Sequence, residues 1–247
     1  MNLDEQLKQS GQWLFERRSY LPLALVVVLA PAMLNFEYPG GKHSLDVAWE
    51  TLCLAVSLTG LGLRVVVVGF AADGTSGRNT REGQVAASLN TTGPYSLVRH
   101  PLYFANYLMW LGVMLFPRAW WCPVIGSLAF WLYYERIVIA EESFLRWRFG
   151  DEWEVWARRT PTFLPSLRAW RRPARSFSLR RVLRTEYSAL FAVIAVMTVL
   201  EVVGDVLVGG RFEMEPMWLV LFAVSAVAYV LLRTIKHRRA ARPHSRP

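Results

Sequence analysis

The chain has 247 residues, of which 53% are hydrophobic and 19% charged, and its formal net charge is +9 at pH 7. Several apolar stretches approach the ~20 residues that are needed to cross a bilayer, which ordinary core helices seldom contain. This pattern excludes a soluble globular protein. The basic excess lies beside the apolar stretches, where anionic lipid headgroups attract Lys and Arg. We therefore expect membrane lipids as partners, and no nucleic acid.

Six apolar stretches are predicted to be transmembrane helices. The first follows a mixed-charge segment, so we expect a retained anchor and not a cleaved signal peptide. The third and fourth are joined by the short turn 117–123, which predicts an antiparallel hairpin. The fold class is an all-α integral membrane protein with about six transmembrane helices and a central helical hairpin. The predicted spans are Leu21 to Phe36, Leu45 to Phe70, Leu102 to Phe116, Val124 to Ala140, Tyr187 to Val208 and Met217 to Leu232.

Basic residues are distributed unevenly between the two sides of these spans. With the amino terminus in the cytoplasm, 24 Lys and Arg residues fall on the cytoplasmic side. Only Lys42, Arg118 and Arg211 fall outside. This asymmetry satisfies the positive-inside rule. We expect both termini in the cytoplasm and the protein in a bacterial inner membrane.

The composition along the chain suggests five parts. The basic tail contains proline and is expected to be disordered. The loop Ala72 to Thr92 contains several glycines, which suits either a backbone that closes on a ligand or a flexible connector. The expected parts are an anchor with the second helix (1–71), a core (72–166), a basic cytoplasmic linker (167–186), a final helix pair (187–235) and the tail (236–247).

The run Arg99 to Tyr103 stands where a polar loop becomes an apolar helix. Pro101 suits the first helical position, so the free amides that follow it attract an anion. Arg99 and His100 add donors at the same place, and Tyr95 adds a ring and a hydroxyl. These residues form either an anion site or a simple junction, in which Arg99 reaches lipid phosphate and His100 caps the helix.

Glu141 and Glu142 lie where the second helix of the hairpin returns. Acidic and basic residues at a helix end often form a solvated face, and Glu142 is placed to pair with Arg146 four residues on. However, the first and last turns of an antiparallel hairpin are neighbours. The cationic junction and the acidic pair are therefore expected to converge.

A pocket with anion donors, aromatic rings and carboxylates suits S-adenosylmethionine, whose sulfonium aromatic faces attract. The motifs resemble those of the isoprenylcysteine carboxyl methyltransferase and phospholipid methyltransferase group. The resemblance covers about residues 72–166. Its motifs are Gly93-Pro94-Tyr95, Arg99-His100-Pro101-Leu102-Tyr103, Glu141-Glu142, Phe149-Gly150 and Phe163-Leu164-Pro165.

The resemblance implies a membrane-embedded, S-adenosylmethionine-dependent methyltransferase that binds its cofactor on the cytoplasmic side. Its acceptor would be a lipid or lipidated molecule, methylated on a carboxylate or an amine. In the isoprenylcysteine branch, an Arg four residues before the cofactor Glu contacts substrate. Here that position is Ile137, and Arg136 is adjacent. The implied cofactor contacts are Leu89, Asn90, Tyr95, His100, Pro101, Leu102, Tyr103 and Glu141.

Charged residues inside spans are costly and usually functional. Arg64 lies about two turns from the cytoplasmic end of the second span, where it either reaches lipid phosphate or faces the pocket. With Arg136, it is our candidate for substrate binding. Glu50, Glu201 and Asp205 lie toward the outer ends of their spans, where hydration explains them, and receive no role.

Methyl transfer is an in-line displacement, so catalysis can come mainly from alignment of the reactants. We assign Arg99 and Glu142 to catalysis, with Glu142 as the candidate base for an amine acceptor. Gly60 and Gly62 form no nucleotide fingerprint and instead suit close helix packing. No paired His or Cys spacing suggests a metal.

Two other functions remain open. One is a membrane reductase related to sterol reductases, which uses a nicotinamide cofactor. The other is a non-enzymatic transporter or scaffold, although the chain lacks the paired broken helices of many transporters.

Overall fold

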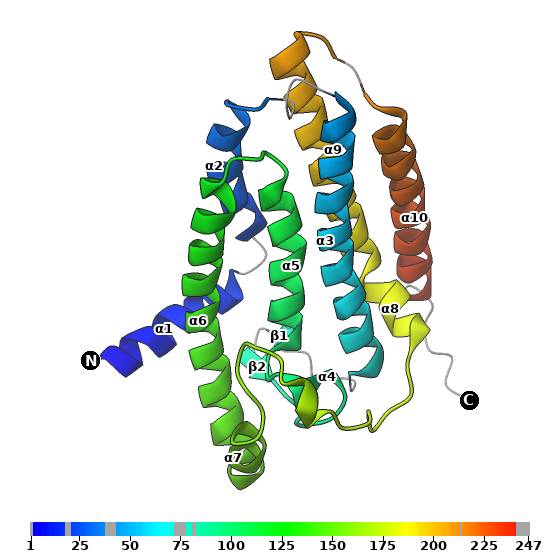
Figure 1. Cartoon of the computed structure of the whole chain (residues 1–247). Helices are drawn as coiled ribbons and strands as arrows, with labels where there is room; N and C mark the ends of the chain where they lie inside the picture. Colours follow the sequence, from blue (N-terminus) through cyan, green and yellow to red (C-terminus); the bar gives the residue numbers. More distant parts are fainter. Residues whose placement is uncertain are drawn as a thin grey trace.

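The computed structural model describes residues 2–17, 21–37, 43–71, 78–80, 83–212 and 214–240. Most elements are helices, and the long helices α3, α5, α6, α9 and α10 run along one common direction (Figure 1). In chain order they are α1 (Leu3–Glu16), α2 (Leu21–Met33), α3 (His43–Phe70), β1 (Arg78–Thr80), β2 (Gly83–Val85), α4 (Pro94–Leu97), α5 (Pro101–Leu115), α6 (Trp121–Phe149), α7 (Asp151–Ala157), η3 (Leu167–Ala169), α8 (Leu179–Thr185), α9 (Tyr187–Gly209) and α10 (Pro216–Ala240).

All six predicted apolar stretches form helices, and the all-α membrane fold is confirmed. Of the helices among the described residues, four are long and apolar enough to cross a membrane. α5 is apolar but shorter, and α2 has 13 residues with Pro31 inside it. α6 continues past its predicted end at Ala140 because no helix breaker follows until Gly150, whose φ is +51°. The four long spans are Ser44–Phe70, Trp121–Phe149, Tyr187–Gly209 and Pro216–Arg238.

The predicted hairpin is present, since α5 and α6 run antiparallel on either side of a short turn (Figure 1). α5 also packs closely against α3, and glycines make this approach possible. A Cβ added at Gly60 would lie 2.6 Å from the carbonyl oxygen of Ala105, and one added at Gly112 would lie 2.4 Å from that of Cys53. The packing role predicted for Gly60 is confirmed. It is wrong for Gly62, where a Cβ would meet no atom within 4 Å.

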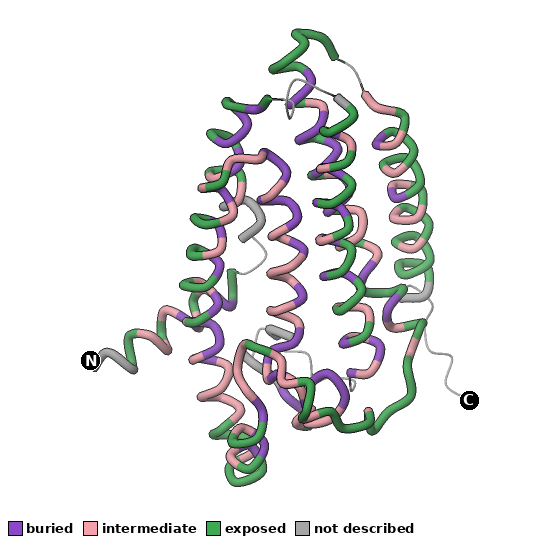
Figure 2. The backbone as a smooth tube through the Cα atoms, viewed as in Figure 1, coloured by how far each residue is buried: buried purple, intermediate pink, exposed green. Residues whose placement is uncertain are grey.

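Buried residues lie mainly where the helices face one another, and exposed residues lie on the outer faces (Figure 2). Many of these exposed residues are large and apolar. α10 shows this most clearly, because most of its turns are exposed although the helix is strongly apolar. An apolar exposed surface of this kind suits contact with lipid. The core includes the fully buried side chains of Met114, Phe116, Met197 and Trp218, which come from α5 and its C-cap, from α9 and from α10.

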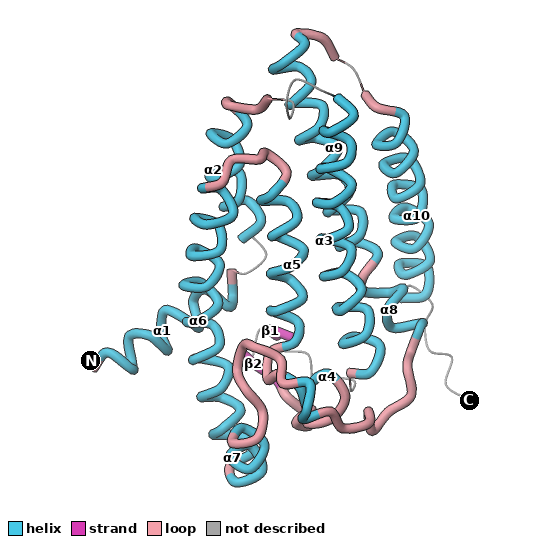
Figure 3. Tube along the Cα trace, viewed as in Figure 1, coloured by secondary structure: helices cyan, strands magenta, loops and turns pink. Residues whose placement is uncertain are grey.

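Two features lie at the end of the bundle that carries α4. Part of the predicted loop 72–92 forms a short antiparallel hairpin of β1 and β2, in which Asn79 pairs with Gln84. Strands of three residues are too short to show a periodic pattern, so the sequence did not indicate them. Beyond α7, residues 170–178 run as an extended segment beneath α4 to α8 (Figure 3). We call this segment the strap.

The strap is tied to the loop before α5 and to the end of α3. The Gly93 amide donates to the carbonyl of Arg171 at 3.0 Å, and the Arg171 amide donates to Ser96 Oγ at 2.9 Å. Gly93 has φ +61°, and a Cβ there would lie 3.2 Å from Pro173, so glycine suits this position. The Ser178 amide donates to the last turn of α3, at the carbonyl of Gly69.

Candidate active site

The site is built around the first turn of α5. Pro101 occupies the first helical position, as predicted, and His100 occupies the N-cap position without a side-chain capping hydrogen bond. The loop before them is fixed from the chain beyond α7, because the Arg99 amide donates to the carbonyl of Pro161 at 2.8 Å. Trp156 of α7 donates its indole N–H to the carbonyl of Tyr95 at 3.0 Å. The loop before α5 is therefore hydrogen-bonded to α7 and to the chain that follows it.

The two ends of the hairpin converge as expected. His100 Nε2 lies 3.0 Å from Glu142 Oε1, and His100 Nδ1 lies 3.6 Å from Glu141 Oε2. The Tyr103 hydroxyl donates to Glu141 Oε2 at 2.7 Å. One imidazole thus lies between two carboxylates, with a phenol beside it.

This geometry determines the protonation of His100. Burial of the ring would lower its pKa, but the hydrogen bonds and negative charges of Glu141 and Glu142 outweigh burial and raise the pKa from 6.5 to about 9. His100 is therefore an imidazolium at neutral pH. It presents a fixed positive charge at the start of a helix, where backbone amides also favour an anion.

Arg99 completes the cluster. Its Nε lies 3.2 Å from Glu142 Oε1, so Glu142 faces both Arg99 and His100. The guanidinium also donates to Thr162 Oγ1 and lies over the Trp153 ring, with Cζ 5.8 Å from the ring centroid. Thr162 and Trp153 were not predicted as site residues. Their roles depend on a chain reversal after α7 that sequence periodicity does not reveal.

Aromatic rings extend the site along α5 and α6. The rings of His100 and Tyr103 are stacked, with centroids 5.4 Å apart and an interplanar angle of 8°. The Tyr103 ring lies 4.5 Å from that of Tyr134, which in turn lies 4.2 Å from that of Phe130. Such a wall suits a cationic group. Tyr134 and Phe130 were not predicted, since they read as ordinary apolar positions of a span.

The predicted loop contacts line a cavity of about 140 Å³ beside the junction. Leu89, Asn90 and Tyr95 all contribute to its wall. Burial, and then the charge of Glu141, raise the pKa of the Tyr95 hydroxyl, so the phenol stays neutral. A larger cavity of about 400 Å³ lies on the other side of Thr91, between α7 and η3. Of these three residues, Tyr95 is affected by the charge of Glu141, and the cavity is also lined by the end of α3 and by the strap.

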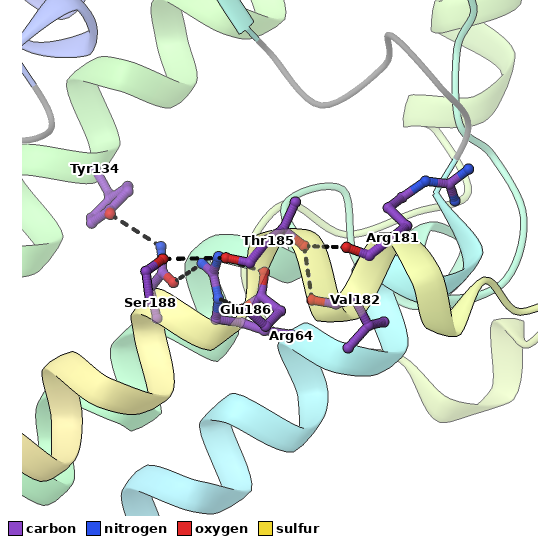
Figure 4. Close-up of polar contacts among 8 residues, drawn as sticks. Arg64, Tyr134, Arg181, Val182, Thr185, Glu186 and Ser188 are labelled. Carbon is purple, nitrogen blue, oxygen red and sulfur yellow. Dashed lines mark hydrogen bonds and ion pairs between the residues drawn. The ribbon is translucent and has the colours of Figure 1, made fainter. Parts of the chain in front are cut away.

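Arg64 belongs to a second polar group that lies deeper between the helices (Figure 4). Its Nε and Nη2 donate to the two carboxylate oxygens of Glu186 at 2.7 and 3.0 Å. Its Nη1 donates to Asn106 of α5, and Asn106 Nδ2 lies 3.4 Å from the Tyr134 hydroxyl. Sequence patterns missed Glu186, because it lies in the junction between α8 and α9, far along the chain.

The other substrate candidate, Arg136, makes a contact within its own helix. Its Nη1 donates to the carbonyl of Leu132, one turn earlier. The α6 backbone at this turn packs against α1, where a Cβ added at Gly11 would lie 2.0 Å from the Arg136 carbonyl oxygen. No ion pair or hydrogen bond recorded for the described side chains joins Arg136 to Glu141 or Glu142. Its contact with an acceptor stays a prediction.

The family model for phospholipid methyltransferase matches residues 51–152. This segment is similar to the phospholipid methyltransferase family. It contains Arg64 and all five residues of the His100 cluster, namely Arg99, His100, Tyr103, Glu141 and Glu142. The resemblance seen in the sequence is confirmed for this part of the chain.

Individual relatives have two kinds of name. The cobalt-zinc-cadmium resistance protein CzcN of Cupriavidus metallidurans is 35% identical over 60% of this chain and 63% of its own length. Protein-S-isoprenylcysteine O-methyltransferases are similar at 30% identity in Schizosaccharomyces pombe, over 31% of this chain and 33% of theirs, and at 29% in Mus musculus, over 50% and 47%. The chain thus spans less than two thirds of the curated relatives it matches. No solved structure matches it.

Proposed function

We propose that this chain is a membrane-embedded methyltransferase that takes its methyl group from S-adenosylmethionine and transfers it to a lipid or lipidated acceptor. The observation that carries the proposal is the contact of His100 with both Glu141 and Glu142. The match of residues 51–152 to the phospholipid methyltransferase family model supports the same conclusion, as do the helices that are long enough to span a membrane.

The residues present fit the cofactor chemically. The His100 imidazolium and the start of α5 suit a carboxylate, while Glu141 suits an amino group or a ribose diol. The rings of Tyr103 and Tyr134 suit a sulfonium, and the cavity at Leu89, Asn90 and Tyr95 suits part of an adenosine. When bound, S-adenosylmethionine supplies an electrophilic methyl group.

The remaining catalytic contribution of this chain is positioning. Glu142 faces Arg99 and His100, so in this arrangement it holds two cations in place. A carboxylate acceptor needs no base, whereas an amine acceptor would require Glu142 to leave these partners and accept a proton. We assign Arg64 to the anionic part of an acceptor, since its side chain is 22% exposed beside the aromatic wall.

The proposed orientation places the His100 cluster and both termini in the cytoplasm of a bacterial inner membrane. It rests on 24 basic residues on that side against three on the other. A reporter fused after Pro247 should be cytoplasmic, and one inserted near Gly209 should be external. The reverse pair of results would contradict the orientation.

The direct test combines binding and turnover. Purified protein in nanodiscs should be stabilised against heat by S-adenosylmethionine and not by NADPH, because the site offers partners for a zwitterion. Incubation with labelled S-adenosylmethionine and a total lipid extract should then label one lipid class, which mass spectrometry identifies. Stabilisation by NADPH alone would instead favour the reductase.

A further inference from the structure

Three acidic side chains meet at the end of the bundle opposite the His100 cluster. Asp46 and Glu50 lie one turn apart near the start of α3, and Glu201 comes from α9. Each residue is only 1% exposed, and one oxygen from each lies within 4.8 Å of the others. We call these residues the acidic triad. Their expected hydration is wrong for Glu50 and Glu201, and also for Asp205, which is 7% exposed.

The triad has fewer partners than its charge requires. Trp218 Nε1 donates to Glu50 Oε2 at 2.8 Å, and Arg118 pairs with Asp46 Oδ1. Among the described residues, no hydrogen-bond donor reaches Glu50 Oε1 or Glu201 Oε2, although both atoms are buried. Buried carboxylate oxygens normally have a partner, and a buried charge without one is strongly destabilising.

Charge and distance both indicate which partner would suit. When all three carboxylates are ionised, the Arg118 guanidinium leaves two negative charges, which match one divalent cation. Oxygen ligands lie about 2.3–2.6 Å from Ca²⁺, so two of them on opposite sides of the ion are separated by about 4.6–5.2 Å. The oxygens of the triad lie within this span.

We propose that Asp46, Glu50 and Glu201 bind one hard divalent cation of the Ca²⁺ and Mn²⁺ class. The ligand set is all oxygen, which favours these ions over metals that prefer sulfur or imidazole. Because α3 and α9 both supply ligands, the ion would join the outer end of α3 to the final helix pair. The site shares no residue with the His100 cluster, so its test does not depend on methyl transfer.

The competing explanation is that Glu50 and Glu201 share a proton. Both explanations remove negative charge, but only the cation site predicts saturable metal binding. Mn²⁺ distinguishes them, because its six-line electron paramagnetic resonance signal in solution disappears on binding. The probe is used with tag-free, chelator-treated full-length protein in nanodiscs of zwitterionic lipid, so that tags and headgroups bind little metal.

The expected result is one Mn²⁺ bound per chain, displaced by Ca²⁺, with a rise in Tm. Glu201→Gln should weaken Mn²⁺ binding at least tenfold and abolish the rise in Tm. Asp205→Asn is the matched control, because it removes a neighbouring carboxylate of α9 that is not a ligand, and it should weaken binding less than threefold.

Two results would overturn the proposal: wild-type protein that binds no Mn²⁺ at millimolar concentration, or equal binding by wild type and Glu201→Gln. If Glu201→Gln does not fold, Glu50→Gln takes its place. The wild-type titration is decisive in either case, because the absence of binding alone rejects the site.

Discussion

The two ends of the helix bundle differ in how far their carboxylates are paired with positive charges. At the His100 cluster, two carboxylates face an imidazolium, a guanidinium and a phenol, and Glu141 and Glu142 remain about one-fifth exposed. At the acidic triad, three almost fully buried carboxylates face Arg118 alone among the described cations. The first end is preorganised by the protein itself. The second depends on a charge that the protein does not supply.

The strongest test of internal pairing is Arg64→Ala. It leaves Glu186, whose side chain is 5% exposed, without its partner. Removal of one member of a buried pair is strongly destabilising, and we expect the free energy of unfolding to fall by about 2–4 kcal/mol. Denaturant titration in mixed micelles measures this. The double variant Arg64→Leu with Glu186→Leu should regain most of the lost free energy of unfolding. If it does not, the loss in Arg64→Ala does not come from the unpaired charge of Glu186.

Glu141→Gln tests whether the His100 cluster binds the cofactor. It removes the charge that Tyr103 and His100 face, and we expect S-adenosylmethionine to bind more weakly by about 1.5–3 kcal/mol. Isothermal titration in nanodiscs measures the change. The exposed Glu135→Gln on the same helix serves as the control and should bind normally. An unchanged affinity in folded Glu141→Gln would remove Glu141 from the site.

The raised pKa of His100 predicts a pH dependence. Because the pKa is about 9, cofactor affinity should be nearly constant from pH 6.5 to 8 and should fall about tenfold between pH 8 and 10. The contribution of His100 to folding has the same sign, since it is complete below pH 6.5 and is lost as the pH rises through 9. In His100→Gln this fall in affinity should disappear. A fall of equal size in the variant would assign it to another group.

At the acidic triad, replacement of one carboxylate should stabilise the folded protein. In metal-free protein, Glu201→Gln relieves repulsion within the triad, so we expect the free energy of unfolding to rise by about 1 kcal/mol. This is the opposite sign to Arg64→Ala. A loss of stability in the absence of metal would mean that Glu201 is satisfied by the protein alone.

The smallest effect on cofactor binding is expected for Arg136→Ala. Its recorded contact lies within α6, so cofactor affinity should stay within about threefold. Methyl transfer should fall if the long side chain reaches an anionic acceptor. A wild-type rate at all acceptor concentrations would leave Arg136 as a lipid-facing residue.

Sequence analysis predicted the contacts within one helical hairpin, and it missed the contacts between helices that are far apart in the sequence. His100, Glu141 and Glu142 were expected to meet because one short turn makes the two ends of a hairpin neighbours. Glu186 was missed because no pattern along the chain fixes how α9 is rotated against α3. The acidic triad was missed for the same reason: Glu50 and Glu201 lie in different spans, and their burial depends on how the helices pack. Spacing rules for metals detect only ligands that lie close in sequence.

The strap contains trypsin cleavage sites whose accessibility depends on the loop before α5. It carries exposed arginines, yet Gly93 and Ser96 bind its backbone at Arg171. Cleavage by trypsin after Arg171 therefore requires the hydrogen bonds between the strap and the loop before α5 to break. Limited digestion of intact protein, with and without S-adenosylmethionine, should show slower cleavage in the strap when the loop is held closed. The rate of cleavage in the strap would then report whether the loop before α5 is closed, without any measurement of methyl transfer.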